Sequence, residues 1–363
     1  MSESRAAAGS GAAQLRLALP GKGTLEGATL TFLAECGLKV QRSNPRQYLA
    51  RISSLPELEV VFQRAADIPA LVHDGDAILG ITGYDLLAEF RGHAEEPDED
   101  EKSDDDLVVL ERDLGYGSCR LVVAVPETWI DVNTCADLWH LAGYYQEHKR
   151  RGLRIATKYP TLTRHFLRRH GISHCRIVTP HGALEAAPLT GAADLIVDLT
   201  ETGTTLRENH LKLLDDGVVL RSQACLIGNV RFLNQDPQAQ RVARVLLELI
   251  NARLQARNRV LLTAYVPGSG EEVRSLLSMH LKRLVPGFEY HIGSSESTDD
   301  PQAQRCRVSG VLQMGTAVAD LVEIITALRS VGAEHIDVTP LAYRFGQEPA
   351  SLRLLSERTA QRP

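Results

Sequence analysis

Residues 194–206 have the sequence DLIVDLTETGTTL, and this stretch decides the fold. An apolar run ends in the carboxylate of Asp198, and a turn rich in threonine and glycine follows at once. The pattern predicts a buried strand over residues 195–199, a tight turn, and a helix over residues 204–214. A strand that leads directly into a helix is the repeating unit of an α/β fold.

The turn between this strand and helix has the chemistry of a phosphate site. Gly203 lets the backbone approach a ligand closely, and the N–H groups at a helix start favour an anion. Thr202, Thr204 and Thr205 add hydroxyl donors, and Asp198 could accept hydrogen bonds from ribose hydroxyls. Together these groups favour a ribose 5-phosphate site. The alternative is an ordinary helix start in which Thr202 or Thr204 is the N-cap.

Strand and helix patterns alternate on both sides of this stretch. The other strands are expected at 15–19, 58–62, 77–81, 107–110, 121–125, 153–156, 175–178, 218–222 and 224–227. The other helices are expected at 25–36, 68–72, 162–170, 184–188 and 237–255, the last with Asp236 as its N-cap and Pro237 as its first residue. This alternation predicts an α/β fold with largely parallel sheets, in two lobes around a ligand cleft like that of periplasmic binding proteins.

The C-terminal part of the chain has a different pattern. Strands are expected at 260–266, 288–292, 306–314 and 335–338, with helices at 271–281 and 317–331. The resulting βαββαβ order is that of a ferredoxin-like domain. The expected organisation is a flexible tail at 1–14, lobe I at 15–118 and 215–257, lobe II with the phosphate turn at 119–214, the ferredoxin-like domain at 258–345, and a tail at 346–363.

Composition narrows the class of protein. Of the 363 residues 44% are hydrophobic and 24% charged, as in globular proteins. No apolar run approaches the roughly 20 residues that span a bilayer, and the N-terminus lacks the apolar core of a signal peptide, so a cytoplasmic protein is expected. The basic run 149–151 is short and lacks aromatic neighbours, which argues against nucleic-acid binding.

No spacing of acidic, cysteine or histidine residues in this sequence indicates a metal site. The net charge of −6 comes from residues 95–106, which hold nine carboxylates and one lysine and are expected to form a solvated insertion. The six cysteines are scattered, and the histidines have no HxH or HExxH spacing. We therefore assign no residue as a metal ligand.

Residues 185–206, EAAPLTGAADLIVDLTETGTTL, resemble the signature of the ATP phosphoribosyltransferase family, which performs the first step of histidine biosynthesis. The Glu, Gly and Asp residues and the Thr-Gly-x-Thr loop of that signature match in register. The likeness extends to residues 15–25, 68–83, 113–121, 155–160 and 221–227. The C-terminal domain resembles the histidine-binding regulatory domain of the family's long form.

The resemblance implies a pentosyltransferase reaction. The 5-phosphoribosyl group passes from phosphoribosyl pyrophosphate to N1 of ATP, and pyrophosphate leaves as its Mg²⁺ complex. The implied partners are ATP, phosphoribosyl pyrophosphate, histidine as feedback inhibitor, and further copies of the chain in a homo-oligomer from dimer to hexamer. Catalysis would be mainly positioning and charge stabilisation, so no catalytic residue is assigned.

The resemblance also implies roles for individual residues. Asp198 and the loop would hold the ribose and its 5-phosphate, and Glu185 and Asp194 would shape or support that pocket. Three residues are candidates for ATP or pyrophosphate, and two of them are cations that would offset negative charge. The donor set is Glu185, Asp194, Asp198, Thr202, Gly203, Thr204 and Thr205, and the ATP or pyrophosphate set is Lys22, Gly23 and Arg64. The family's opening turn has Arg where this chain has Thr24, so one expected cation is missing.

Two other functions stay open at this point. A solute-binding protein also has two lobes around a cleft, although it would carry a signal peptide. A catalytically impaired paralogue that binds a small molecule and only regulates would keep the same loop. Insertions at about 95–106, 132–151 and 293–304 avoid the phosphate turn and leave these alternatives undecided.

Overall fold

The chain folds into two compact units. The computed structural model describes residues 15–44, 47–92, 106–179, 183–281, 289–293, 305–314, 319–333 and 335–353. The first unit runs to Leu246 and takes in the stretch from Ala350, and the second covers Leu247–Pro349, so the division falls inside a long helix. The tail predicted at 1–14 and most of the acidic segment lie outside the described residues.

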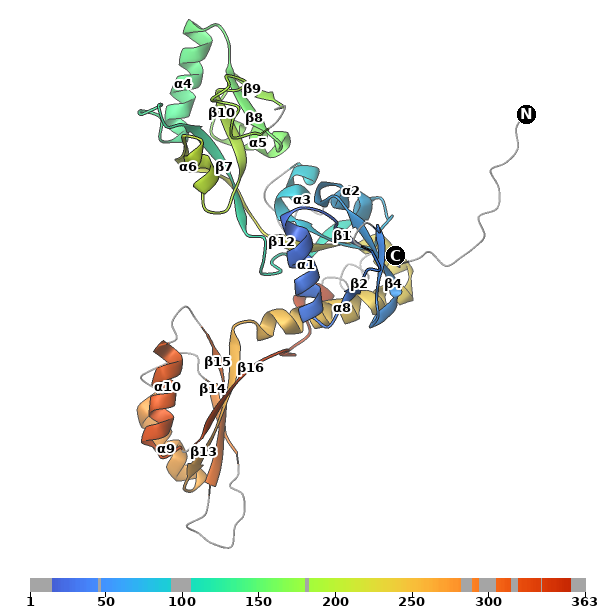
Figure 1. Cartoon of the computed structure of the whole chain (residues 1–363), viewed down its shortest axis with the longest axis vertical. Coiled ribbons are helices and arrows are strands. Elements are labelled where there is room, and N and C mark those ends of the chain that lie inside the picture. The colour runs from blue at the N-terminus through green and yellow to red at the C-terminus, as the bar shows by residue number, and fades with distance from the viewer. Residues whose placement is uncertain are drawn as a thin grey trace, which may run out of the picture. The chain divides into compact units, whose positions relative to one another are not determined.

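Lobe I of the first unit is a seven-stranded sheet in the order β2-β3-β4-β1-β5-β12-β6 (Figure 1). Its strands are β1 (Leu15–Pro20), β2 (Val40–Gln41), β3 (Leu49–Ile52), β4 (Leu55–Gln63), β5 (Leu79–Gly83), β6 (Leu107–Glu111) and β12 (Ala224–Asn229). Its helices are α1 (Thr24–Glu35), the 3₁₀ turn η1 (Ala65–Asp67), α2 (Ile68–His73), α3 (Tyr84–Arg91) and α7 (Val230–Gln235). β1 lies between β4 and β5 and is parallel to both.

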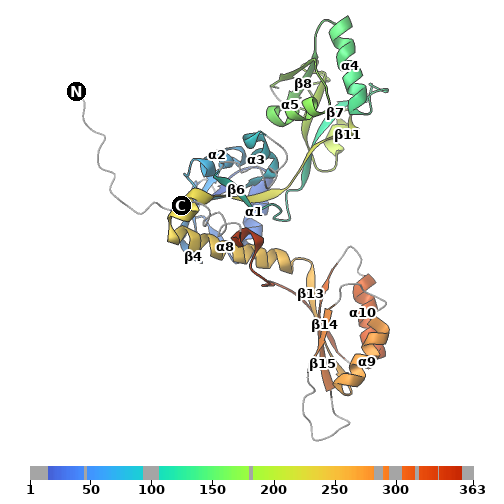
Figure 2. The same ribbon diagram turned by 180° about the vertical axis from the view of Figure 1, so that it is seen from behind.

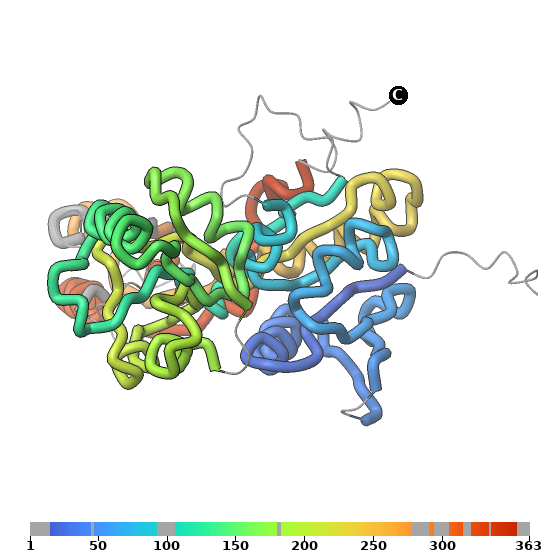
Figure 3. Tube along the Cα trace, turned by 90° about the horizontal axis from the view of Figure 1, so that it is seen from above, coloured from blue at the N-terminus to red at the C-terminus, as the bar shows by residue number. Residues whose placement is uncertain are grey.

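Lobe II is a five-stranded sheet in the order β11-β7-β10-β8-β9. Its strands are β7 (Cys119–Pro126), β8 (Leu153–Thr157), β9 (Cys175–Val178), β10 (Leu195–Thr200) and β11 (Leu211–Ser222), and its helices are α4 (Cys135–His148), α5 (Pro160–Arg169) and α6 (Thr204–Glu208). The chain enters this lobe between β6 and β7 and returns between β11 and β12. Figure 3 follows this path, with lobe I mainly blue to cyan and lobe II mainly green.

The prediction of largely parallel sheets is wrong. β8, β9 and β10 form a parallel group in lobe II, but β7 and β11 run antiparallel to their neighbours, and so does β12 in lobe I. Parallel neighbours need a crossover such as a helix, whereas β3 and β4 are joined by a short turn and must pair antiparallel. The two lobes therefore have mixed sheets with parallel centres.

Two predicted helices also need correction. The helix expected over residues 204–214 ends at Glu208, and β11 begins at Leu211 after His210 takes a left-handed backbone (φ 55°). β11 pairs with β7 as far as Ser222, so this sheet continues past the lobe boundary expected at residue 214. The short helix expected at residues 184–188 is a series of turns.

The long helix α8 (Pro237–Ala256) begins as predicted. The N–H of Gln238 donates to the Asp236 carboxylate at 2.8 Å, and Pro237 is the first helical residue. β2, β3, α3 and α7 were not predicted, because they are short and their apolar residues show no clear period. No helix in the described residues is long and apolar enough to cross a membrane.

The second unit has the predicted βαββαβ order. β13 (Arg259–Pro267), β14 (Glu289–Ile292), β15 (Arg305–Gln313) and β16 (Ile336–Pro340) form an antiparallel sheet in the order β14-β15-β13-β16. The helices α9 (Gly270–Leu281) and α10 (Ala319–Ser330) lie on one face of that sheet (Figure 2). Buried side chains between helices and sheet, such as Val266, Leu277 and Ile324, form its core.

Candidate active site

A cavity of about 480 Å³ lies where strands of both lobes end. Lobe I lines it with the turn after β1 and with residues that follow β4 and β5. Lobe II lines it with the end of β10, the turn before α5 and Cys119. Its lining residues are Lys22, Gly23, Thr24, Leu25, Ala28, Ala65, Gly83, Asp85, Leu86, Gly117, Cys119, Tyr159, Leu199, Thr200 and Glu201. Ligands of open α/β sheets bind at the carboxyl ends of the strands, and this cavity has that position.

The opening turn reaches the cavity because β1 and β4 are parallel and end together. Pro20 pairs with Gln63, and the Gly21 N–H donates to the Gln63 carbonyl at 2.8 Å. Lys22 and Gly23 line the cavity, and Thr24 lies beside them where the family has arginine. Arg64 follows directly after β4 and is exposed, but only its neighbour Ala65 lines the cavity.

The turn after β10 is held by its own hydrogen bonds. Gly203 has φ 78°, a conformation that glycine adopts without strain, and its N–H donates to the hydroxyl of Thr200 at 2.8 Å. The hydroxyls of Thr202 and Thr204 are bonded to each other at 2.9 Å. Gly203 is therefore the N-cap residue of α6, in place of either threonine considered from the sequence.

One cation folds over this turn. Arg207 donates to the Thr202 carbonyl at 3.4 Å and to the Thr204 hydroxyl at 3.2 Å. Thr205 is exposed, and its hydroxyl has no hydrogen-bond partner within the part of the chain that the structure describes. The turn thus combines a guanidinium, an exposed hydroxyl and a helix start, a donor set suited to a phosphate group. Sequence reasoning missed Arg207, which follows the matched signature by one residue.

Asp198 has two charged neighbours. Burial raises the pKa of its carboxyl, Glu185 raises it further, and the Leu199 N–H and the charge of Lys158 act in the opposite direction. The Leu199 N–H donates to Asp198 Oδ1 at 2.8 Å. Glu185 and Lys158, which follows β8, are therefore near enough to Asp198 for their charges to shift its pKa.

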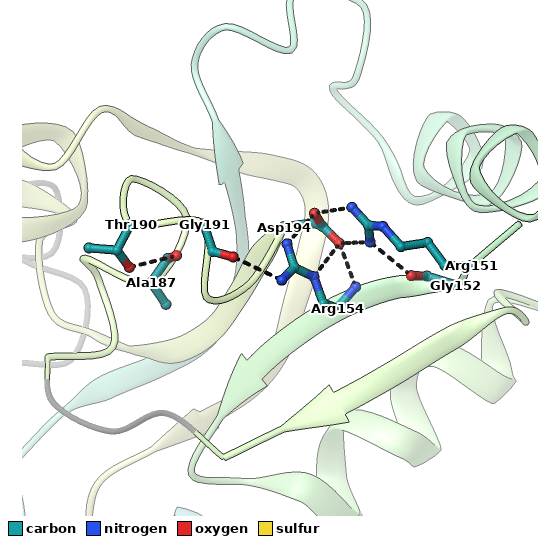
Figure 4. Close-up of polar contacts among 7 residues, drawn as sticks. All are labelled: Arg151, Gly152, Arg154, Ala187, Thr190, Gly191 and Asp194. Carbon is teal, nitrogen blue, oxygen red and sulfur yellow. Dashed lines mark hydrogen bonds and ion pairs between the residues drawn. The ribbon is translucent and has the colours of Figure 1, made fainter. Parts of the chain in front are cut away.

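Asp194 lies at the opposite end of β10 from Asp198. Its carboxylate accepts from Arg151 at 2.6 and 2.9 Å and from the N–H and guanidinium of Arg154 at 2.8–3.3 Å (Figure 4). Although burial raises the pKa of this carboxyl, the arginine hydrogen bonds lower it more, and the net pKa is well below the ordinary value. Arg154 also donates to the Gly191 carbonyl at 2.8 Å, so this cluster fixes the turns that carry Glu185.

A buried polar cluster joins the two lobes beside the cavity. The Tyr159 hydroxyl donates to Asp85 Oδ2 and the Ser222 hydroxyl donates to Asp85 Oδ1, both at 2.6 Å. Burial, with the nearby Asp85 charge, raises the pKa of the Tyr159 phenol, so the phenol keeps its proton and remains a donor. Burial likewise raises the pKa of the Cys119 thiol to about 11, which argues against a nucleophilic role at neutral pH.

These residues were missed although the matched segments end next to them. Asp85 lies two residues after the segment that ends at Gly83, and Tyr159 falls inside the segment 155–160. No pattern within either segment marks its polar side chain as one half of a contact between lobes.

Two α/β lobes around a cavity, with a turn rich in hydroxyl donors and a nearby carboxylate, fit a phosphoribosyl-transferring enzyme, that is, a pentosyltransferase. Residues 64–255 match the family model described as ATP phosphoribosyltransferase. The ATP phosphoribosyltransferase of Afipia carboxidovorans is 38% identical over 333 residues, which cover 92% of this chain and 94% of that protein. The chain belongs to the ATP phosphoribosyltransferase family of histidine biosynthesis.

Other similar proteins carry the same name. ATP phosphoribosyltransferase 2, chloroplastic, of Arabidopsis thaliana is 36% identical over 355 residues, covering 95% of this chain and 81% of that protein. A chain of the ATP phosphoribosyl transferase (HisG:HisZ) complex from Thermotoga maritima is 28% identical, with a TM-score of 0.46, and the match covers 65% of this chain and 98% of that chain.

Proposed function

We propose that the turn Thr202–Thr205 binds the 5-phosphate of phosphoribosyl pyrophosphate and that Asp198 binds the ribose hydroxyls. One observation carries this proposal: Leu199–Glu201, the residues between Asp198 and the turn, line the same cavity as Lys22 and Gly23. The exposed hydroxyl of Thr205 and the guanidinium of Arg207 supply donors at the turn, and Arg207 would exchange its bonds to Thr202 and Thr204 for bonds to phosphate.

We further propose that the turn after β1 serves the pyrophosphate and the triphosphate of ATP. Lys22 supplies a positive charge. Gly23 has φ 86°, and no atom lies within 4 Å of a Cβ placed on it, so a ligand could approach its backbone closely. Arg64 follows the neighbouring strand β4 and is adjacent in the chain to the cavity residue Ala65. A cavity volume of about 480 Å³ lies in the range of small-molecule sites. Two nucleotide-sized substrates would need a larger cavity, so we propose that the lobes move apart to bind both.

The chemistry that follows is direct displacement. N1 of the adenine attacks C1 of the ribose as the bond to pyrophosphate breaks, and positive charge builds up on the ribose ring. Asp198 and its neighbour Glu185 would place negative charge near that ring, which stabilises the transition state more than the ground state. The buried hydroxyl of Tyr159 and the turn residues hold the substrates in line, so positioning accounts for most of the remaining rate.

Mg²⁺ is the cation that we propose to accompany pyrophosphate. The cavity offers oxygen donors of the kind a hard cation takes, namely the Thr200 hydroxyl and the Asp85 and Glu201 carboxylates. Both Asp85 oxygens already accept hydrogen bonds, so Glu201, which is exposed, is the residue expected to reach the cation directly or through water. The cation would neutralise charge on the leaving pyrophosphate.

We propose that the second unit binds histidine and that this binding inhibits the enzyme. The support is its βαββαβ order, the likeness of this region to the regulatory domain of the long form, and its separation from the cavity residues, all of which belong to the first unit. Assembly as a homo-oligomer in the cytoplasm belongs to the same proposal.

The test of the site assignment is release of pyrophosphate when ATP and phosphoribosyl pyrophosphate are supplied together with Mg²⁺. Wild-type protein should release it only with both substrates, and Arg207→Ala and Glu201→Gln should each lower the rate. Pyrophosphate release that persists unchanged in Thr205→Ala, Arg207→Ala and Asp198→Asn would refute the proposed donor site. Full wild-type activity without any divalent cation would refute the proposed role of Mg²⁺.

A further inference from the structure

The start of α5 is capped by a side chain from the other lobe. A helix start leaves backbone N–H groups without helical partners, and a serine, threonine or aspartate next to the helix usually accepts them. α4 in the same lobe follows this rule, because its N-cap Thr134 accepts from Asp137. The N-cap residue of α5 is Tyr159, whose side chain makes no such bond.

Glu89 of α3 takes over this role. Its Oε1 accepts from the Thr161 N–H at 2.8 Å and its Oε2 from the Leu162 N–H at 2.9 Å. The remaining groups at this helix start are also accounted for. Pro160 has no N–H, the Tyr159 N–H donates to Thr157, and the Thr163 N–H donates to the Tyr159 carbonyl. Glu89 thus satisfies both N–H groups that nothing in lobe II reaches.

A carboxylate is well suited to this position. The N-terminal end of a helix carries partial positive charge, so a half-buried anion that accepts two N–H groups there is bound more firmly than a neutral cap. Glu89 lies four residues after Asp85 on the same face of α3, and Asp85 binds Tyr159. Two carboxylates of one lobe I helix therefore hold Tyr159, Thr161 and Leu162 of lobe II.

The capped segment carries groups that the reaction uses. Tyr159 lines the cavity. Lys158 precedes it in the chain, and its positive charge counteracts the rise in the pKa of Asp198 that burial causes. The backbone of both residues is fixed by where α5 begins. We propose that Glu89 is a positioning residue: it caps α5 across the lobes and so sets the positions of Lys158 and Tyr159 against substrate. The kinetic part of this inference rests on the proposed donor site, and the structural part does not.

The experiment compares Glu89→Ala and Glu89→Gln with the wild-type full chain. Glu127→Ala is the matched control, because Glu127 is a lobe II carboxylate, 47% exposed and paired only with His210 at 3.7 Å in the described residues. Hydrogen exchange of a peptide over residues 158–166 reports the cap, and a peptide from α4 serves as internal reference. Steady-state kinetics with each substrate varied in turn report positioning, and melting temperature reports stability.

Loss of the cap in Glu89→Ala should speed exchange over 158–166 by about tenfold and leave α4 unchanged. We expect kcat/KM for phosphoribosyl pyrophosphate to fall by about tenfold to a hundredfold, at a temperature where the variant stays folded. Glu89→Gln keeps one carbonyl oxygen as an acceptor and should fall between Glu89→Ala and wild type in both measurements. Glu127→Ala should match wild type.

Three outcomes would overturn the inference. Exchange over 158–166 that matches wild type in both variants would show that Glu89 does not hold this helix start. Faster exchange with unchanged kcat/KM would show a cap without a positioning role. If Glu89→Ala does not fold, Glu89→Gln decides, and wild-type kinetics in that variant would refute positioning. The proposed donor site is refuted independently of the Glu89 cap if Thr205→Ala binds phosphoribosyl pyrophosphate normally while Glu89→Ala still shows faster exchange and lower kcat/KM.

Discussion

Asp194→Asn tests whether Asp194 is a structural carboxylate, in contrast to Asp198, which we propose binds the ribose. Five hydrogen bonds end on the Asp194 carboxylate, whose side chain is 8% exposed. The amide of asparagine would turn N–H groups toward Arg151 and Arg154, which are themselves donors. Removing one partner of a buried ion pair costs about 3–5 kcal/mol. Because the two arginine side chains are 38% and 33% exposed, we lower the expectation to about 2–4 kcal/mol.

The assay is thermal unfolding across pH. A loss of about 2–4 kcal/mol corresponds to a melting temperature lower by roughly 5–12 °C in a unit of this size. The arginines lower the pKa of Asp194 in the folded protein. Its contribution to stability is therefore present above the unfolded pKa, near 4, and is lost as the pH falls through the folded pKa. The difference in melting temperature between wild type and Asp194→Asn should be largest near pH 7 and should decrease below about pH 4.

Asp198→Asn is the matched control at the other end of the same strand. Burial raises the pKa of Asp198, so its charge opposes folding at neutral pH, and asparagine should leave the melting temperature unchanged or higher. Asp198→Asn should lose about 1–3 kcal/mol of the binding free energy of phosphoribosyl pyrophosphate, because the ribose hydroxyls lose a charged acceptor. Asp194→Asn should show the reverse, with donor KM within about twofold, since four residues of strand span about 13 Å. Normal melting with weakened donor binding in Asp194→Asn would refute this division of roles.

The remaining predictions concern the phosphate turn, the acidic segment and the second unit. Thr205→Ala and Gly203→Val should weaken binding of phosphoribosyl pyrophosphate far more than binding of ATP. Gly203→Val acts because a branched residue is strained at φ 78°. An equal loss of affinity for both substrates in calorimetry would contradict this prediction. Replacing residues 95–106 with a Gly/Ser linker should leave turnover within about tenfold, and a larger loss would place the segment in the active site or an interface. Histidine should bind the full chain in calorimetry but not a chain ending at Ala256; failure of both to bind would refute the regulatory proposal. Because Leu352 is buried and belongs to the first unit, a chain in which a linker replaces residues 258–349 is the better comparison, and it too should not bind.

Local signals were enough to predict β10 and the start of α6. The strand begins with the apolar run Leu195–Val197, whose side chains are all buried, and Gly203 marks the turn. The end of the helix was predicted wrongly because the apolar residues from Leu211 to Leu214 fit a helical period as well as a strand. Their conformation is decided by pairing with β7, about ninety residues earlier in the chain, and helix propensity cannot report that contact.

The contacts between lobes were beyond sequence reasoning for the same reason. Tyr159 meets Asp85 across 74 residues, and Glu89 meets Thr161 across 72. Nothing near α5 in the sequence shows that its start lacks a cap of its own, except that tyrosine stands where serine, threonine or aspartate is usual. A missing local cap is thus a weak but usable sign that a distant side chain supplies one.

The positions of Asp194 and Asp198 along β10 could have been distinguished from the sequence alone. Asp198 lies in the second half of the strand and Asp194 directly precedes it, and in an open α/β sheet ligands gather at the carboxyl ends of strands. The turn after β1, Asp85 after β5, Lys158 after β8 and Asp198 all fit that rule, and Asp194 does not. Family likeness carried both aspartates into one predicted site because it records which residues recur in the family. Strand direction gives each a separate reason: Asp198 lies toward the end of the strand whose last residues line the cavity, as the proposed ribose contact requires, and Asp194 binds two arginines at the strand's start.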